Sequence, residues 1–307
     1  MTIDMKLGLL MLVLLLVAEI AAGEYRKPRT FTMGELGVSL ISFFNLALVR
    51  ATQLAGLTWL LNAFLPAWKG ALGSVSPWLV FPVAMLIDDY GNYWVHRMGH
   101  TVRWMWRLHK AHHTATNLNV LATMRNNWIF YALIPNTTMA ALLYFLGATE
   151  AAMGVLGLKI VILNLQHTGV RWDLWLRKFT PTRWLLNGLE KILVLQDYHH
   201  VHHGIGRYGN ASSNYANMFV FWDHLHGTSM GSPRKHQDAY GLPVGVEAEP
   251  WYEQVWWPLF RGSRRVPTVA ASAFELPKFS AEDVARAKAV IYLPDGRPVV
   301  VSGGAAR

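Results

Sequence analysis

The sequence predicts an all-α integral membrane protein with about four to five transmembrane or partly embedded helices and a small α/β tail at its C-terminus. The chain of 307 residues is 52% hydrophobic and only 15% charged, whereas ordinary soluble domains carry about 25% charged residues. Long apolar runs recur through its first half, and histidines gather directly beyond the ends of those runs. Together these features favour a membrane protein with a polar site at the membrane boundary.

The first three apolar runs predict the N-terminal helices. Residues 7–23 form a run followed by a basic cluster, which favours a retained span, although the run is short enough for a signal peptide. Residues 37–66, interrupted by Arg50, predict either one tilted span or a kinked helical hairpin. Residues 77–95 begin at a proline and lead into the first histidine group.

Two further runs, residues 129–147 and 151–168, are joined by a short turn and predict a helical hairpin. Pro135 and Lys159 interrupt these runs, so we expect the hairpin to be partly embedded.

The chain changes character at about residue 230, where the apolar spans stop. Ser280–Ala289 predicts a short helix, because Ser280 is a favourable N-cap and acidic residues follow it. Val290–Leu293 and Pro298–Val301 predict a β-hairpin. The expected organisation is therefore an N-terminal transmembrane region (1–76), a histidine-rich domain (77–229) and a soluble tail (230–307).

The distribution of Lys and Arg predicts which side of the membrane the histidines occupy. Basic residues follow the first run, lie between the third run and the hairpin, and follow the hairpin, whereas only Lys69 lies between the second and third runs. By the positive-inside rule, all histidine groups fall on the cytoplasmic side of a multi-pass protein. The same rule accounts for the net charge of +9, and no basic stripe interleaved with aromatic residues indicates a nucleic acid partner.

Eleven of the 13 histidines fall in four groups, and the spacing of three groups is typical of metal ligands on helices. The groups are His96 and His100; His109, His112 and His113; His199, His200, His202 and His203; and the weaker pair His224 and His226. Residues three or four apart share one helical face. Burying several imidazoles together is unfavourable unless each finds a partner, and a metal ion provides one. The sequence therefore predicts a polynuclear metal site.

The identity of the metal is less constrained. Imidazole binds iron, zinc, copper and nickel alike, and eight or nine ligands indicate two ions. The chain has no cysteine, which excludes disulfides and a cysteine nucleophile and argues against thiolate-rich zinc or iron–sulfur sites.

Three motifs in combination resemble the fatty acid hydroxylase/sterol desaturase superfamily. They are Asp89-x-x-x-Tyr93-Trp94-x-His96-Arg97-x-x-His100, then Trp106-Arg107-Leu-His109-Lys-Ala-His112-His113, then His199-His200-Val-His202-His203-Gly204 continuing through Asn214-Tyr215 to Trp222-Asp223 and Gly227-Thr228. The resemblance covers about residues 77–228. It implies a membrane enzyme with two non-haem iron ions, whose histidine boxes sit on a cytoplasmic helical cap.

The resemblance also implies the reaction and its partners. The enzyme would hydroxylate, or less favourably desaturate, a lipid C–H bond with O2, using electrons from a separate cytochrome b5-like or ferredoxin-like protein. Zinc or another divalent metal would be able to occupy the site in isolated protein.

The motif matches imply the ligand set residue by residue. The matching ligands are His96, His100, His109, His112, His113, His199, His202 and His203, and His167 resembles an isolated family histidine between the second and third boxes. His200 fills a variable slot and is a candidate tenth ligand. Arg171 stands where some relatives have a histidine, so that ligand is missing or replaced by a water, His200 or a carboxylate.

Three aspartates are candidates for orienting the ligands. Asp89, Asp197 and Asp223 are expected to accept a hydrogen bond from the distal ring nitrogen of a ligating histidine, with helix capping or surface charge as the alternative. Two other functional classes remain open: a membrane metal transporter or storage protein, for which ligands within the spans are expected, and a zinc-stabilised scaffold.

Overall fold

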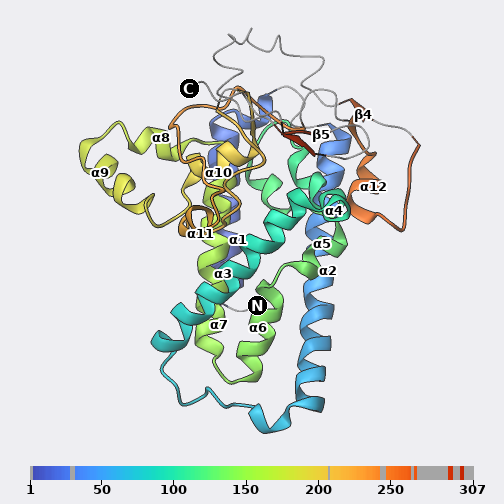
Figure 1. Ribbon diagram of the computed structural model, residues 1–307, viewed down its shortest axis with the longest axis vertical. Coiled ribbons are helices and arrows are strands. Elements are labelled where there is room, and N and C mark those ends of the chain that lie inside the picture. The colour runs from blue at the N-terminus through green and yellow to red at the C-terminus, as the bar shows by residue number, and fades with distance from the viewer. Residues whose placement is uncertain are drawn as a thin grey trace.

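The fold is built mainly from helices. The computed structural model describes residues 3–27, 32–206, 208–242, 247–263, 266–267, 290–292 and 298–300. Within these residues the strands form three two-stranded sheets, and the remaining regular structure is helical. Figure 1 shows long helices along the main axis of the molecule and shorter elements gathered at one end of them.

Four helices of 19 residues or more form the long part of the molecule: α1 (Ile3–Ala21), α2 (Met33–Phe64), α3 (Pro77–Thr101) and α7 (Thr149–His167). Helix α2 is continuous, so the predicted run contains one helix and not a kinked hairpin. Its first turn is capped by the Thr32 side chain, which accepts a hydrogen bond from the Glu35 amide at 3.1 Å. Helix α7 packs against both α1 and α3.

The run at residues 129–147 is divided by Pro135. Helix α5 (Trp128–Leu133) ends before it, and α6 (Asn136–Phe145) begins after it, because proline lacks the N–H that a helix interior requires. The Asn127 side chain caps α5 by accepting from the Ile129 amide at 3.0 Å. Helices α6 and α7 pack together, which confirms the second part of the predicted hairpin.

Two of the described helices, α2 and α7, are long and apolar enough to cross a membrane by length and composition. A shorter apolar helical segment spans Gly8–Ala21. Helix α3 is long enough but does not qualify, and its second half carries charged residues and the first histidine pair. The four to five embedded helices expected from the sequence are therefore not confirmed within the described residues.

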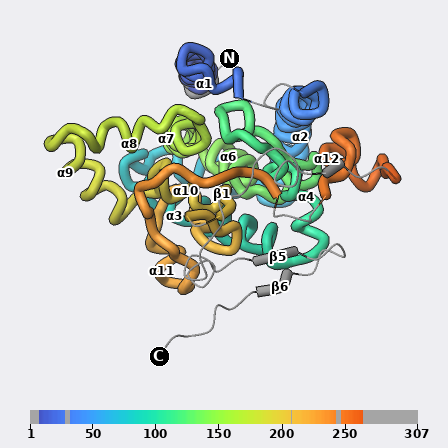
Figure 2. The backbone as a smooth tube through the Cα atoms, turned by 90° about the horizontal axis from the view of Figure 1, so that it is seen from above, coloured from blue at the N-terminus to red at the C-terminus, as the bar shows by residue number. Residues whose placement is uncertain are grey.

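Shorter elements complete the described chain. They are the 3-10 turns η1 (Glu24–Arg26), η2 (Pro66–Trp68) and η3 (Val120–Met124), and the helices α4 (Arg103–His113), α8 (Trp172–Leu176), α9 (Thr180–Leu189), α10 (Gln196–His203), α11 (Phe221–Leu225) and α12 (Trp251–Trp256). Figure 2 shows α9 and α12 at opposite edges, with α10 near the middle of the molecule.

The three sheets are antiparallel pairs. Strand β1 (Gly204–Ile205) pairs with β2 (Ala239–Tyr240), β3 (Glu247–Ala248) with β4 (Val266–Pro267), and β5 (Val290–Tyr292) with β6 (Pro298–Val300). The last pair confirms the predicted C-terminal hairpin. The predicted helix at Ser280–Ala289 lies outside the described residues.

A buried carboxylate fastens α1 to the rest of the fold. Glu19 is fully buried, and its Oε1 accepts hydrogen bonds at 2.8 Å from the Val120 amide, the Gly169 amide and the Thr168 hydroxyl. Its Oε2 accepts from the Tyr25 hydroxyl at 2.7 Å. One side chain thus joins α1 to the segments before α5 and after α7.

We expect Glu19→Ala to lower the free energy of unfolding by about 1–3 kcal/mol or more, because four donors would lose their acceptor in a buried site. Thermal unfolding of the purified protein in detergent measures this change. Glu19→Gln is the matched control: it keeps a carbonyl oxygen and should lose less. An alanine variant as stable as the parent protein would contradict the assigned role.

Candidate metal centre

Nine buried histidines from four helices converge at two adjacent points. The five-histidine group consists of His96, His100, His109, His113 and His202, and the four-histidine group consists of His112, His167, His199 and His203. Within each group, one ring nitrogen per residue lies within 4.8 Å of those of the other members. The structure thus brings together all nine histidines that the sequence analysis selected as the main ligands.

Helical spacing divides the three ligand candidates on α4 (His109, His112 and His113) between the two groups, and likewise those on α10 (His199, His202 and His203). On α4, His109 and His113 are four residues apart and join the five-histidine group, while His112 turns toward the other group. On α10 the division is reversed, since His199 and His203 join the four-histidine group while His202 joins the five-histidine group. The His113 and His203 rings stack across the boundary with centroids 4.4 Å apart. The two groups are therefore direct neighbours.

Several rings are oriented by a hydrogen bond at Nδ1, away from the centre of their group. The Nδ1 atom of His96 lies 2.7 Å from the Tyr215 carbonyl, and that of His202 lies 2.8 Å from the Ser213 carbonyl. A carbonyl can only accept, so in both rings Nδ1 carries the proton and Nε2 has the free lone pair. This is the tautomer that a metal ion requires.

The inward nitrogens meet the main test of fit for a metal ion. Buried ring nitrogens with no hydrogen-bond partner include Nε2 of His96, His109, His113, His202 and His203. So many unsatisfied buried acceptors in one place are unfavourable without a shared partner. A cation in each group would satisfy them.

The four-histidine group contains very close nitrogens. The Nε2 atom of His167 lies 3.1 Å from that of His112 and 2.9 Å from that of His199. These separations fit nitrogens that share one ion at about 2.0–2.1 Å.

Burial keeps these imidazoles neutral. The pKa values of His109, His113 and His202 lie well below the ordinary value of 6.5, because burial penalises the charged form and neighbouring imidazoles repel an added proton. Neutral imidazole is the metal-binding form. The site is thus ready to take a cation at neutral pH.

A loop held by buried hydrogen bonds supplies the two carbonyls that orient His96 and His202. Asp223 is fully buried and accepts hydrogen bonds at 2.9 Å from the amides of Tyr215 and Ala216. Asn214, with a φ of 55°, donates to the Tyr198 carbonyl at 2.9 Å and accepts from the Met230 amide at 2.7 Å. Asp223 therefore acts on His96 through the backbone of Tyr215.

The expected contact between a carboxylate and a histidine ring is corrected for all three aspartates. Asp223 holds the loop as described above. Asp89 accepts from the Phe219 amide at 3.0 Å and the Trp222 indole at 3.1 Å, and Asp197 is paired with Arg171. Neutral carbonyl groups orient the rings instead, which avoids burying further charge beside the histidines.

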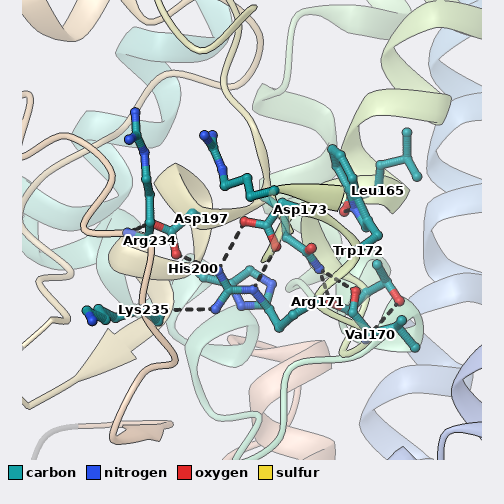
Figure 3. Close-up of polar contacts among 12 residues, drawn as sticks. Leu165, Val170, Arg171, Trp172, Asp173, Asp197, His200, Arg234 and Lys235 are labelled. Atoms are coloured by element: carbon teal, nitrogen blue, oxygen red, sulfur yellow. Dashed lines mark hydrogen bonds and ion pairs between the residues drawn. The ribbon is translucent and has the colours of Figure 1, made fainter. Parts of the chain in front are cut away.

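Arg171 and His200 belong to a separate polar cluster, drawn in Figure 3. Arg171 donates two hydrogen bonds to the Asp173 carboxylate, at 3.0 and 3.1 Å, and also contacts Asp197. The Nδ1 atom of His200 lies 2.7 Å from the Tyr240 hydroxyl, and the residue lies outside both histidine groups. Neither side chain supplies the additional ligand considered at the Arg171 position.

The remaining candidate histidines lie elsewhere. His226 stacks on the rings of Tyr90 and Tyr93, at centroid distances of 5.9 and 5.0 Å. His224 is exposed. Neither His224 nor His226 joins a histidine group, which agrees with their weaker spacing signal.

Asn126 contributes to the site but was not selected from the sequence. Its Oδ1 lies 3.0 Å from the Nδ1 atom of His109, and its carbonyl accepts from the Ser42 hydroxyl at 3.2 Å. A polar residue soon after a histidine box was the available signal.

A cavity leads from the histidines toward the long helices. Five histidines line one end of it: His96, His109, His112, His167 and His199. Apolar side chains line much of its wall, among them Leu46, Val95, Phe130 and Leu163. The arrangement can admit an apolar chain to the edge of both histidine groups.

Comparison with known proteins agrees with this arrangement. Residues 81–228 match the family model described as "Fatty acid hydroxylase". The chain is 32% identical over 178 residues to alkylglycerol monooxygenase of Homo sapiens, covering 54% of this chain and 34% of the relative. It is 28% identical over 173 residues to methylsterol monooxygenase 1-3 of Arabidopsis thaliana, covering 54% and 53% respectively.

A further relative is alkylglycerol monooxygenase of Xenopus tropicalis, 29% identical over 181 residues, covering 59% of this chain and 36% of the relative. The chain thus spans about a third to a half of the length of the curated relatives it matches. No solved structure matches it. The matched segment contains both histidine groups in full, which confirms the predicted resemblance: over residues 81–228 this chain is similar to the fatty acid hydroxylase family.

Proposed function

We propose that this protein is a membrane-bound oxygenase that uses O2 to hydroxylate, or less favourably desaturate, a C–H bond of a lipid. The observation that carries the proposal is the convergence of nine buried imidazoles beside an apolar cavity. The names of the relatives support it, since two of them are monooxygenases of alkylglycerols and methylsterols.

The proposed cofactor is a pair of non-haem iron ions, one in each histidine group. The five-histidine group and the four-histidine group would each hold one ion through the inward ring nitrogens. Iron bound in this way supplies the activation of O2 that attack on an unactivated C–H bond requires.

The protein's own residues hold the ligands in position and exclude water. Backbone carbonyls of Ser213 and Tyr215 fix two rings, and Asn126 fixes a third. Every member of both groups is buried. The apolar wall formed by residues such as Leu46 and Leu163 would align a lipid chain beside the histidines without admitting bulk solvent.

The proposed membrane placement follows from the long helices and the basic residues. Helices α2 and α7 would cross the bilayer, with α1 and α3 beside them, so the protein would be multi-pass. The basic segments predict a cytoplasmic location for the histidine groups. A separate cytochrome b5-like or ferredoxin-like protein would deliver electrons there.

Removal of two ligands of the five-histidine group, one from α4 and one from α10, tests the proposal. We expect His109→Ala and His202→Ala to lower bound iron and to reduce O2-dependent lipid oxidation more than 100-fold. Altering only the hydrogen-bond partner of a ligand already costs about 10–100-fold. Iron content and oxidised lipid in membranes expressing each variant measure both effects.

His224→Ala is the matched control, because His224 is exposed and outside both groups. It should keep full iron content and activity. Unchanged oxidation in both His109→Ala and His202→Ala would refute the proposal, whereas iron loss without any oxidation in the parent protein would favour a metal-binding protein without catalysis.

Acid should destabilise the metal-free protein. The buried imidazoles have a lowered pKa in the folded state, so the unfolded chain binds more protons as pH falls below its pKa of about 6.5. Their contribution to stability is therefore complete above pH 6.5 and is lost below it, by up to about 1.4 kcal/mol per pH unit for each histidine.

Thermal unfolding of chelator-treated protein between pH 7.5 and pH 5 measures this dependence. The midpoint should be nearly constant down to pH 6.5 and then fall. A midpoint that rises or stays flat toward pH 5 would show that the histidines are not buried in neutral form.

A further inference from the structure

Charged residues lie near the middle of three long helices, away from the histidines. They are Arg50 on α2, Asp88 on α3 and Lys159 on α7. Helices α2 and α7 are the two that are apolar enough to cross a membrane. Ionisable residues at such a depth are costly and commonly mark the path or binding site of a ligand.

Two of these charges form an ion pair beside a second carboxylate. Lys159 is ion-paired with Asp88, and its Nζ lies 3.7 Å from Asp89 Oδ1 and 3.5 Å from Asn136 Oδ1. Asn92 joins the same network, donating to Asn136 Oδ1 at 2.6 Å. Lys159 and Asp88 are almost completely buried, so the pair is shielded from solvent. This network supports the helices without any ligand.

Arg50 is different. Among the described residues, no carboxylate lies within ion-pair distance of its guanidinium and no hydrogen-bond acceptor is matched to it. The amide nitrogen of Asn136 likewise has no acceptor within the described part of the chain, since only its oxygen is engaged. Both residues line the cavity that reaches the histidines. The far end of the cavity therefore offers two donors that are not hydrogen-bonded within the described residues, while Asp88 acts on Arg50 through its charge alone.

Helices α3 and α7 set the distance between this charged level and the histidines. Asp88 precedes His96 by eight residues on α3, and Lys159 precedes His167 by eight residues on α7. At 1.5 Å per residue, the charged level lies about 12 Å from the histidine level along both helices. The cavity reaches from Arg50 and Asn136 to the histidines, and apolar side chains such as Leu46 and Leu163 line it between them, as a lipid chain requires.

We infer that Arg50 binds an oxyanion end group, such as a carboxylate, of a single-chain lipid and thereby selects the carbon that meets the histidines. Guanidinium donates two parallel hydrogen bonds to such a group, and the Asn136 amide adds a third donor nearby. The binding of an oxyanion end group by Arg50 does not depend on the proposed function, whereas the selection of the oxidised carbon rests on it.

Equilibrium binding to the purified full-length protein in detergent tests the inference. The probes are hexadecanoic acid, its methyl ester and hexadecan-1-ol, which share a chain and differ at the end group. The parent protein should bind the acid about 10–100-fold more tightly than the ester, as expected for charge-assisted hydrogen bonds. This comparison needs no variant and no turnover.

Variants then assign the effect to one side chain. Arg50→Gln should remove the preference for the acid while leaving ester binding unchanged, and Arg50→Lys should keep part of it because Lys retains charge without the planar fork. Arg183→Gln is the control, since Arg183 is exposed on α9 away from the cavity. It should bind all three probes as the parent does.

Equal affinity of the parent protein for acid and ester would overturn the inference, as would an Arg50→Gln variant that still prefers the acid. A loss of affinity for acid and ester alike would also overturn it, by assigning Arg50 a packing role. Acid-selective binding without any oxidation of lipid would keep this inference and refute the proposed function, so the two failures are distinguishable.

Discussion

Nine imidazoles packed out of contact with water impose the main constraint on this fold. Each ring must be neutral, each needs a partner for its nitrogens, and the rings come from segments as distant as His96 and His203. The helices around them are arranged so that the inner nitrogens point together and the outer nitrogens find carbonyl acceptors. A cation in each group resolves the conflict between burial and polarity that the protein alone leaves open.

The surrounding polar residues serve mainly to hold that arrangement. Asp223 and Asn214 fix the loop that orients two rings, and Asp89 fastens α3 to the segment that precedes α11. Arg171 and Asp197 form a separate cluster next to α10. These charged side chains thus stabilise the backbone around the imidazoles and do not compete with them for the cations.

The sequence predicted the clustered histidines better than the residues that hold them in place. Spacing of three and four residues selects side chains on one helical face, so His96, His100 and the two triplets were recoverable without coordinates. The division of each triplet between two groups was not, because it depends on how α4 and α10 cross. The partners of Asp89 and Asp197 are distant in sequence, and no local pattern encodes them. The break at Pro135 was foreseeable, whereas the number of transmembrane or partly embedded helices stays a prediction, since only α2 and α7 qualify as spans among the described residues.

Anomalous diffraction at the iron absorption edge, from crystals of protein purified with iron, tests the central claim most directly. The account predicts two peaks for each chain, one among His96, His100, His109, His113 and His202, and one among His112, His167, His199 and His203. A single peak, or none in either group, would contradict it.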